Sequence, residues 1–378
     1  MNSIIPFNIP YVSGIETIRM NEVFADAKFC GDGKFSKLCN EIIVAQTKTP
    51  KALVVTSCTH ALEMTAILCQ IFPGDEVIMP SFTFVSTANA FVLRGAKIKF
   101  VDVRPETMNV DERLIENAIT KKTKAIVIVH YGGVSCEMDT IMGIAKKHKL
   151  FVIEDAAQCM NAFYKEKHLG TIGEFGTLSF HDTKNIHCGE GGALLINDEA
   201  FMDRAEIIRE KGTDRSKYIA GLVDKYSWVD VGSSYSVSEL SAAFLSEQLA
   251  NVEEVTNKRI VLWNHYLALL APLEKAGKIQ LPFIPDGCKH NGHLFFIKCA
   301  HIAERTGLMA YLKNKEIMTS FHYIPLHSSK AGIQFGEFVG NDLNTTIESG
   351  RLLRLPMYYS LKEDQVERVC ELISLFYS

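Results

Sequence analysis

Between residues 51 and 198 the chain alternates short apolar runs with segments of helical periodicity, and this alternation constrains the fold more than any other feature. The apolar runs are almost continuously hydrophobic, as is typical of strands buried on both faces of a sheet. We predict strands at 53–55, 76–79, 98–101, 125–129 and 151–153, with helices at 61–68 and 139–148. The pattern therefore predicts an α/β fold with a large, mostly parallel sheet covered by helices on both faces.

The rest of the chain indicates a second, smaller region. Helical periodicity covers residues 200–211 and then runs from 238 to about 275. A turn-rich segment at 281–287 follows, and a final α/β portion leads to the C-terminus. A length of 378 residues suggests roughly two or three domains. We predict a large domain over residues 1–250 and a smaller C-terminal α/β domain over 251–378.

Charge and composition exclude several classes of protein. Lys and Arg number 40 against 44 Asp and Glu, a net charge of −4, which offers no basic field for nucleic acid or an anionic membrane surface. No apolar run approaches the ~20 residues of a membrane span, and residues 1–6 lack the features of a signal peptide. The ten cysteines include no CxxC pair. We therefore expect a cytoplasmic protein without nucleic-acid or membrane partners and without a disulfide framework.

The predicted strand at 151–153 leads directly into two acidic residues, Glu154 and Asp155. The carboxyl ends of parallel strands are where open α/β sheets bind ligands, so these carboxylates are candidates for a functional site. By itself, Asp155 could equally well cap the helix that follows.

A single lysine, Lys184, lies in a polar loop after the strand-like run 177–180. Most loop lysines are only solvated cations. This one is flanked by hydroxyl groups, a histidine and the glycine-rich turn 189–192, which permits close approach of the backbone. Such surroundings suit a lysine that must be neutral and nucleophilic, as Schiff-base chemistry requires.

The segment 56–61, Thr-Ser-Cys-Thr-His-Ala, lies between a predicted strand and a predicted helix. Backbone N–H groups at a helix N-terminus, with hydroxyls beside them, bind phosphate, although a plain Ser or Thr N-cap is the commoner meaning of such a sequence. The order of the segments is more specific than any one of them. A phosphate site, an aromatic residue and an aspartate at a strand end precede a lysine 29 residues after that aspartate.

These features, in this order, resemble the pyridoxal 5′-phosphate (PLP) enzymes of the aspartate-aminotransferase fold, fold type I. The segments 80–87, 154–158 and 179–185 narrow the resemblance to the DegT/DnrJ/EryC1/StrS family of nucleotide-sugar aminotransferases. The resemblance covers nearly the whole chain, from residue 5 to residue 356. It implies a PLP-dependent aminotransferase with a large sheet domain, a smaller C-terminal α/β domain, and a homodimeric assembly whose active site lies at the interface.

The functional residues of the family carry over position by position, as the resemblance implies. Lys184 would bind the cofactor as a Schiff base and act as the catalytic base, and Asp155 would pair with the pyridine nitrogen. Phe84 would stack on the ring, and Gln158 would lie near the ring hydroxyl. The remaining implied cofactor contacts are to the phosphate, from Cys58, Thr59, Ser179 and, across the dimer, Ser234.

Further segments, 91–97, 136–142 and 321–327, resemble family members that act in lipopolysaccharide and other surface-polysaccharide synthesis. Those enzymes transfer an amino group from L-glutamate to C4 of dTDP-4-oxo-6-deoxy-D-glucose, giving dTDP-4-amino-4,6-dideoxygalactose. The resemblance implies that His322 and His327 face the sugar nucleotide, but both could equally be hydrogen-bonded core residues. A 4-amino-gluco or a 3-amino sugar product stays open as an alternative.

Several positions depart from the family pattern. Cys58 stands where Gly is frequent, and Ser234 stands where the family has an Asn that reaches the phosphate of the partner subunit. His187 and Cys188 replace a small polar pair, and with no third ligand nearby they do not predict a metal site. Two other classes share this fold, namely pyridoxamine-phosphate dehydratases, which carry His in place of the lysine, and non-catalytic regulatory proteins. The presence of Lys184 argues against both.

Overall fold

An eight-stranded sheet in the order β1-β9-β8-β5-β4-β2-β3-β12 forms the centre of the computed structural model, which describes residues 4–378. Only β9 runs antiparallel to its neighbours, and the other strand pairs of this sheet are parallel. The strands are β1 (Lys51–Val55), β2 (Glu76–Pro80), β3 (Lys97–Val101), β4 (Thr123–Val129), β5 (Phe151–Asp155), β8 (Phe175–Ser179), β9 (Gly192–Ile196) and β12 (Gly336–Phe338). The predicted α/β fold with a mostly parallel sheet is confirmed.

Two apolar clusters, one on each face, bury this sheet. Because successive strand residues point to opposite faces, Val54 and Ile126 belong to one cluster while Leu53 and Val127 belong to the other. Residues of α2 (Lys34–Thr47), α6 (Met138–His148) and α9 (Glu239–Ala250) complete the first cluster. Residues of α3 (Cys58–Leu68), α4 (Val85–Val92) and α7 (Met202–Arg209) complete the second. Burial on both faces explains why the strands read as continuous apolar runs.

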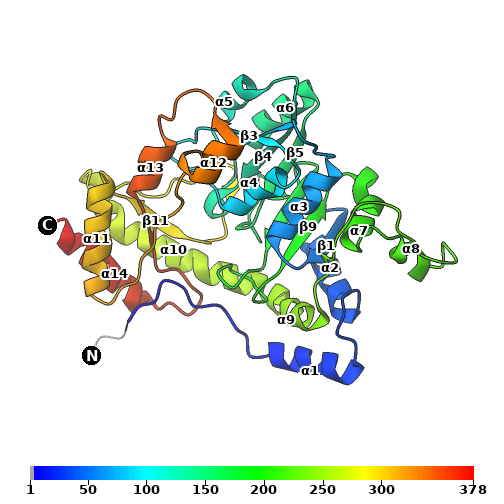
Figure 1. Ribbon diagram of the computed structural model, residues 1–378. Helices are drawn as coiled ribbons and strands as arrows, with labels where there is room; N and C mark the ends of the chain where they lie inside the picture. The colour runs from blue at the N-terminus through cyan, green and yellow to red at the C-terminus, as the bar shows by residue number, and fades with distance from the viewer. Residues whose placement is uncertain (1–3) are drawn as a thin grey trace.

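The C-terminal part of the chain has an apolar core of its own, at the left in Figure 1. Its sheet pairs β11 (Phe295–Lys298) with β13 (Leu352–Leu355). The helices around this sheet are α10 (Val252–Lys275), α11 (Ile302–Asn314), α13 (Thr345–Arg351) and α14 (Glu363–Phe376). The domain boundary predicted at residue 250 stays a prediction. The strand β12 lies after this boundary in the chain, but it pairs with β3 in the large sheet.

The helical stretch predicted from residue 238 to about 275 is present as two helices, α9 and α10, separated at Asn251. The Asn251 side-chain amide donates to the Glu247 carbonyl at 2.8 Å, and its backbone leaves helical geometry with φ −101° and ψ 9°. An asparagine whose side chain competes for a carbonyl one turn earlier can end a helix without Gly or Pro. Helical periodicity continued across this position, so the sequence pattern did not show the break.

The other elements are short or lie outside the central sheet. The helices are α1 (Glu16–Asp26), α5 (Glu112–Ile115), α8 (Arg215–Ile219) and α12 (Lys330–Phe335), and a three-stranded sheet joins β6 (Phe163–Tyr164), β7 (Lys167–His168) and β10 (Cys288–Lys289). Single 3-10 turns lie at η1 (Glu116–Ala118), η2 (Tyr131–Gly133), η3 (Glu199–Phe201) and η4 (Leu326–Ser328). Within residues 4–378, no helix is long and apolar enough to cross a bilayer.

Candidate active site

A cavity of about 740 Å³ opens where β5 and β8 end and where α3 and α4 begin. This is the carboxyl edge of the parallel strands, the place predicted from the position of Asp155. Seven of the eight residues predicted to bind the cofactor line this one cavity: Cys58, Thr59, Phe84, Asp155, Gln158, Ser179 and Lys184. The volume lies within the range of small-molecule sites in proteins.

Lys184 lies in the loop that follows β8, and its half-buried side chain faces the cavity. A tight turn holds the loop, since the Lys184 N–H donates to the His181 carbonyl at 2.9 Å. Burial lowers the pKa of the Lys184 amine, while the nearby Cys58 and Asp155 act in the opposite direction. A lysine with a lowered pKa has a larger neutral, nucleophilic fraction near neutral pH.

Asp155 is the last residue of β5 and is 5% exposed. One carboxylate oxygen accepts from the Thr87 hydroxyl at 2.6 Å, and the other accepts from the Ala157 N–H at 3.2 Å. Burial raises the pKa of Asp155, while these two donors and the positive charge of Lys184 favour its ionised form. A carboxylate held in this way at the base of a cavity can pair with a protonated ring nitrogen. The hydroxyl of Thr87 was not among the residues that sequence reasoning proposed.

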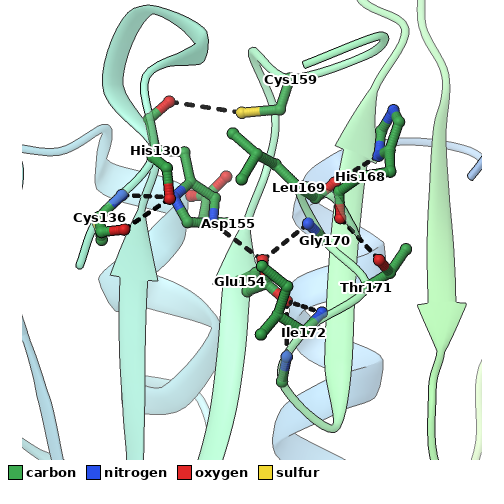
Figure 2. A network of polar contacts seen from close by, with 12 residues as sticks. His130, Cys136, Glu154, Asp155, Cys159, His168, Leu169, Gly170, Thr171 and Ile172 are labelled. Atoms are coloured by element: carbon green, nitrogen blue, oxygen red, sulfur yellow. Dashed lines mark hydrogen bonds and ion pairs between the residues drawn. The ribbon is translucent and has the colours of Figure 1, made fainter. Parts of the chain in front are cut away.

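Glu154, the neighbouring acid, is fully buried in a network of its own, shown in Figure 2. Its carboxylate binds His130 Nε2 at 2.9 Å. It also accepts from three backbone N–H groups of the turn 170–173, at 2.8, 2.6 and 2.7 Å. Burial alone would raise the pKa of Glu154, but His130 and the backbone donors outweigh it and lower the pKa. Of the two adjacent acids in the sequence, only Asp155 lines the cavity. Glu154 instead links the end of β5 to His130 and to the turn 170–173.

The start of α3 provides donors for an anion. Ser57 caps this helix, and its hydroxyl accepts from the His60 N–H at 3.1 Å, so the N-cap interpretation is confirmed for this residue. The N–H groups of the first turn, from Cys58 onward, have no partner within the helix. The backbone of Gly192 packs closely against this turn, and a Cβ at Gly192 would lie only 2.3 Å from the Cys58 nitrogen. A helix N-terminus with an adjacent hydroxyl, here Thr59, fits a phosphate group.

Part of the cavity lining is aromatic. Phe84 directly precedes α4 and is 57% exposed. Gln158 accepts from the Gly132 N–H at 2.6 Å and donates to the Tyr323 hydroxyl at 3.2 Å. Tyr323 in turn stacks on His322, with ring centroids 4.0 Å apart and an angle of 13° between the planes. The amide of Gln158 is therefore held rigidly at the edge of the cavity.

The two histidines of the segment 322–327 have different surroundings. His322 lines the cavity, and its Nδ1 also lies 3.1 Å from the Tyr131 hydroxyl, so its contact with substrate stays a prediction. His327 does not line it and instead binds the Ser81 hydroxyl at 2.7 Å and the Asp342 carboxylate at 3.2 Å, as the hydrogen-bonded core interpretation expected.

Three further candidates from the sequence lie outside the cavity lining. Ser234 pairs with Glu210 in an isolated β-bridge, and its contact with a partner subunit stays a prediction. The His187 ring is buried and binds the Tyr11 carbonyl through Nε2 at 2.7 Å, which accounts for the histidine at that position. The Cys188 thiol donates to the Glu190 carbonyl at 3.4 Å.

Together, the fold and the cavity define a class of protein. A lysine amine, a buried carboxylate and a helix N-terminus meet at the carboxyl edge of a mostly parallel sheet. These groups fit the imine carbon, the ring nitrogen and the phosphate of PLP, respectively. The chain therefore has the architecture of a fold type I PLP enzyme.

Comparison with known proteins identifies the family. The model of the DegT/DnrJ/EryC1/StrS aminotransferase family matches residues 15–374. The spore coat polysaccharide biosynthesis protein SpsC of Bacillus subtilis (strain 168) is 31% identical over 380 residues, which cover 98% of this chain and 97% of that protein. A pleiotropic regulatory protein of Geobacillus stearothermophilus is 33% identical over 361 residues, covering 95% of this chain and 93% of that protein.

Solved structures agree with this assignment. The aminotransferase TlmJ from Streptoalloteichus hindustanus superposes with a TM-score of 0.91 at 25% identity and covers 99% of both chains. S. venezuelae DesV, solved in complex with a ketimine intermediate, superposes with a TM-score of 0.91 at 28% identity, again over 99% of both chains. The protein belongs to the DegT/DnrJ/EryC1/StrS aminotransferase family. It is a PLP-dependent aminotransferase.

Proposed function

We propose that the protein transfers the amino group of L-glutamate to C4 of dTDP-4-oxo-6-deoxy-D-glucose. The product is dTDP-4-amino-4,6-dideoxygalactose, a precursor of surface polysaccharide. The observation that carries the proposal is the meeting of Lys184 and Asp155 in one cavity of about 740 Å³, which has room for a nucleotide sugar beside the cofactor. The polysaccharide role of the Bacillus subtilis relative supports the substrate class.

The cofactor, when bound, withdraws electrons from the reacting carbon and carries the amino group from one substrate to the other. The Asp155 carboxylate would accept a hydrogen bond from the protonated ring nitrogen and so keep that nitrogen positive. The N–H groups of Cys58 and Thr59 and the hydroxyl of Ser179 would bind the phosphate. The ring of Phe84 would cover one face of the cofactor ring.

Lys184 moves the protons in both halves of the reaction. Its amine takes the proton from Cα of the amino donor, and in the second half it returns a proton to C4 of the sugar. Its lowered pKa suits this role because the amine must be neutral to accept a proton. Gln158 is held by Gly132 and Tyr323, and there it would lie near the ring hydroxyl. Water leaves the site as substrate fills the cavity, which strengthens these polar contacts.

We further propose a cytoplasmic homodimer with the active site at its interface. In such an assembly Ser234 of each chain reaches toward the phosphate site of its partner. The substrates are anionic, yet the chain carries a net charge of −4, so binding depends on local donors and not on a global positive field.

Product analysis tests the proposed function. Purified protein is incubated with L-glutamate and dTDP-4-oxo-6-deoxy-D-glucose, and the product is identified by NMR. An axial amino group at C4 is expected, and its H4 shows small couplings to its ring neighbours. An equatorial amino group at C4, or an amino group at C3, would contradict the proposed product. The absence of any amino sugar would overturn the proposed sugar substrate.

Two lysine variants test whether the activity depends on the candidate active site. Lys184→Ala should give no product, because the protein then has no amine to move the proton. Lys167→Ala, which removes an exposed lysine of the β6–β7 sheet, is the matched control and should retain full activity.

A further inference from the structure

Two buried threonines, Thr83 and Thr87, connect the cavity of the candidate active site with the Asp155 carboxylate. Thr87 donates its hydroxyl proton to Asp155 Oδ2 at 2.6 Å, and its oxygen lies 2.7 Å from the hydroxyl oxygen of Thr83. Thr87 is fully buried and does not line the cavity, whereas Thr83 is 1% exposed and lines it. The two side chains thus form a chain of hydrogen bonds, here called the threonine relay, that ends on the carboxylate.

The start of α4 brings the two hydroxyl groups together. Thr83 precedes the N-cap residue Phe84, and Thr87 lies in the first turn of the helix, where its N–H donates to the Phe84 carbonyl at 3.1 Å. This turn places two side chains four positions apart in contact, while Phe84 between them lines the cavity. The same short segment therefore supplies an aromatic wall of the cavity and a polar connection behind it.

Only one arrangement of the protons satisfies the threonine relay when Asp155 is ionised. An ionised carboxylate only accepts hydrogen bonds, so the single hydroxyl proton of Thr87 points to Asp155. The Thr87 oxygen then accepts the hydroxyl proton of Thr83. In such a chain each hydroxyl group polarises the next, so Thr83 strengthens the hydrogen bond between Thr87 and the carboxylate. The relay therefore stabilises Asp155 in its ionised form.

The hydrogen-bond donors to Asp155 are neutral. Besides Thr87, only the Ala157 N–H donates to this carboxylate within residues 4–378, at 3.2 Å. Burial raises the pKa of Asp155, and the Thr87 hydroxyl leads the influences that oppose this rise, followed by Ala157 and by the charges of Lys184 and His130. The balance between burial and these influences decides whether Asp155 is a carboxylate or a carboxylic acid.

Three further titratable groups beside Asp155 carry no charge. Burial raises the pKa of the Cys58 and Cys159 thiols and of the Tyr323 hydroxyl, and the negative charge of Asp155 acts on each in the same direction. These groups are therefore neutral at physiological pH and supply no positive charge to the carboxylate. The ionised form of Asp155 depends all the more on the threonine relay.

We propose that the threonine relay keeps a proton on the ring nitrogen of bound PLP instead of on Asp155. One proton lies between two bases, and a buried carboxylate without donors would take it and leave the ring nitrogen neutral. A neutral ring withdraws electrons less strongly than a protonated one. Thr83 and Thr87 are then positioning residues, because they act on the cofactor only through Asp155. The inference rests on the proposed pairing of Asp155 with the ring nitrogen and is independent of the identity of the sugar.

NMR of the ring nitrogen tests the proposal directly. The enzyme is loaded, without substrate, with PLP that carries an isotopic label at this nitrogen, and the position of the resonance gives the average location of the proton. Thr87→Val keeps the shape of the side chain and removes the hydroxyl. It should retain PLP and shift the proton about 10-fold toward Asp155, the scale of losing one hydrogen bond to a charged group.

Two companion variants separate the hydroxyl groups from the shape of the side chain. Thr87→Ser keeps a hydroxyl at this position and should restore the resonance of the wild type. Thr83→Val removes only the outer hydroxyl, so it should move the resonance in the same direction as Thr87→Val and by a smaller amount. It also provides the same test if Thr87→Val does not bind PLP, which the absorbance of the bound cofactor shows for every variant.

Thr65→Val is the matched control. Thr65 is as fully buried as Thr87 and lies in the neighbouring helix α3, but its hydroxyl donates to the Leu62 carbonyl at 2.7 Å. This variant should show the resonance of the wild type. If Thr87→Val also shows the resonance of the wild type, or if Thr65→Val moves it as far as Thr87→Val does, the inference is wrong.

Asp155→Asn distinguishes a failure of this inference from a failure of the proposed function. If Asp155→Asn moves the resonance and Thr87→Val does not, the threonine relay fails and the pairing of Asp155 with the ring nitrogen stands. If Asp155→Asn leaves the resonance unchanged, the pairing itself fails. If the wild type makes no amino sugar from dTDP-4-oxo-6-deoxy-D-glucose but Thr87→Val still moves the resonance, the proposed sugar substrate fails and the threonine relay stands.

Discussion

At the scale of single residues, the site depends on two groups of opposite charge that burial drives toward their neutral forms. Burial raises the pKa of Asp155 and lowers the pKa of Lys184, and each group partly offsets the shift of the other. In the proposed reaction, a bound ring nitrogen would restore the charge of Asp155, while Lys184 would work as a neutral amine. The same burial would therefore suit the two residues to different roles in one cavity.

Asp155→Asn tests the role of the carboxylate. The amide is nearly the same size and still hydrogen-bonds to Thr87, so the variant should retain bound PLP. It cannot hold a positive charge on the ring nitrogen, and turnover should fall about 100-fold or more, the scale of losing a preorganised electrostatic contact. Steady-state kinetics measures the rate, and cofactor absorbance measures retention. Unchanged turnover would contradict the proposed pairing.

The lowered pKa of Lys184 predicts how the cofactor loads. Only the neutral amine attacks an aldehyde, so covalent binding of added PLP to the apo-protein should become faster as pH rises. Its midpoint should lie below the ~10.4 of an ordinary lysine. Stopped-flow absorbance measures this rate against pH, with Nα-acetyl-lysine as the reference compound. A midpoint equal to that of the reference compound would show that burial does not act on Lys184.

At the scale of elements, the end of β5 positions the Asp155 carboxylate, and the buried network around Glu154 holds that end. Three backbone N–H groups of the turn 170–173 and the ring of His130 converge on one carboxylate (Figure 2). Since Glu154 and Asp155 are adjacent on a strand, loosening the first should also move the second.

Glu154→Gln measures what this network contributes. The amide places N–H groups against N–H donors, so the free energy of unfolding should fall by about 2–4 kcal/mol. Because the pKa of Glu154 is lowered in the folded protein, its contribution is present above the ordinary carboxyl pKa of ~4.3. The contribution is lost as pH falls through the lowered pKa. Urea unfolding at several pH values, with the exposed Glu166→Gln as control, tests this expectation. Equal stability of the two variants at pH 7 would contradict it.

At the scale of the whole molecule, an exposed apolar segment bears on the proposed homodimer. In Figure 1, α8 and the chain after it extend from the body of the protein. This segment exposes Ile219 (60%), Leu222 (74%) and Trp228 (83%), and large exposed apolar groups gathered on one segment are typical of interaction surfaces. We propose that the segment contributes to the homodimer interface.

Trp228→Glu tests the assembly. The wild type should sediment with twice the 42.2 kDa mass of one chain, and the variant should shift toward the monomer because a buried charge opposes association. Activity should fall with it if the active site is completed across the interface. Leu375→Glu, at another exposed apolar position (57%) on α14, is the control and should remain dimeric. A monomeric wild type would overturn the proposed dimer.

The sequence by itself determined the fold class and the main components of the site. Continuous apolar strands require a sheet buried on both faces, and Asp155 and Lys184 could be located because strand ends meet at one edge. The tertiary structure alone decided which groups surround them. Thr87 contacts Asp155 across 68 residues of chain, and Arg354 lines a pocket with Lys184 although 170 residues separate them. Such contacts depend on packing between distant elements, which no local periodicity records.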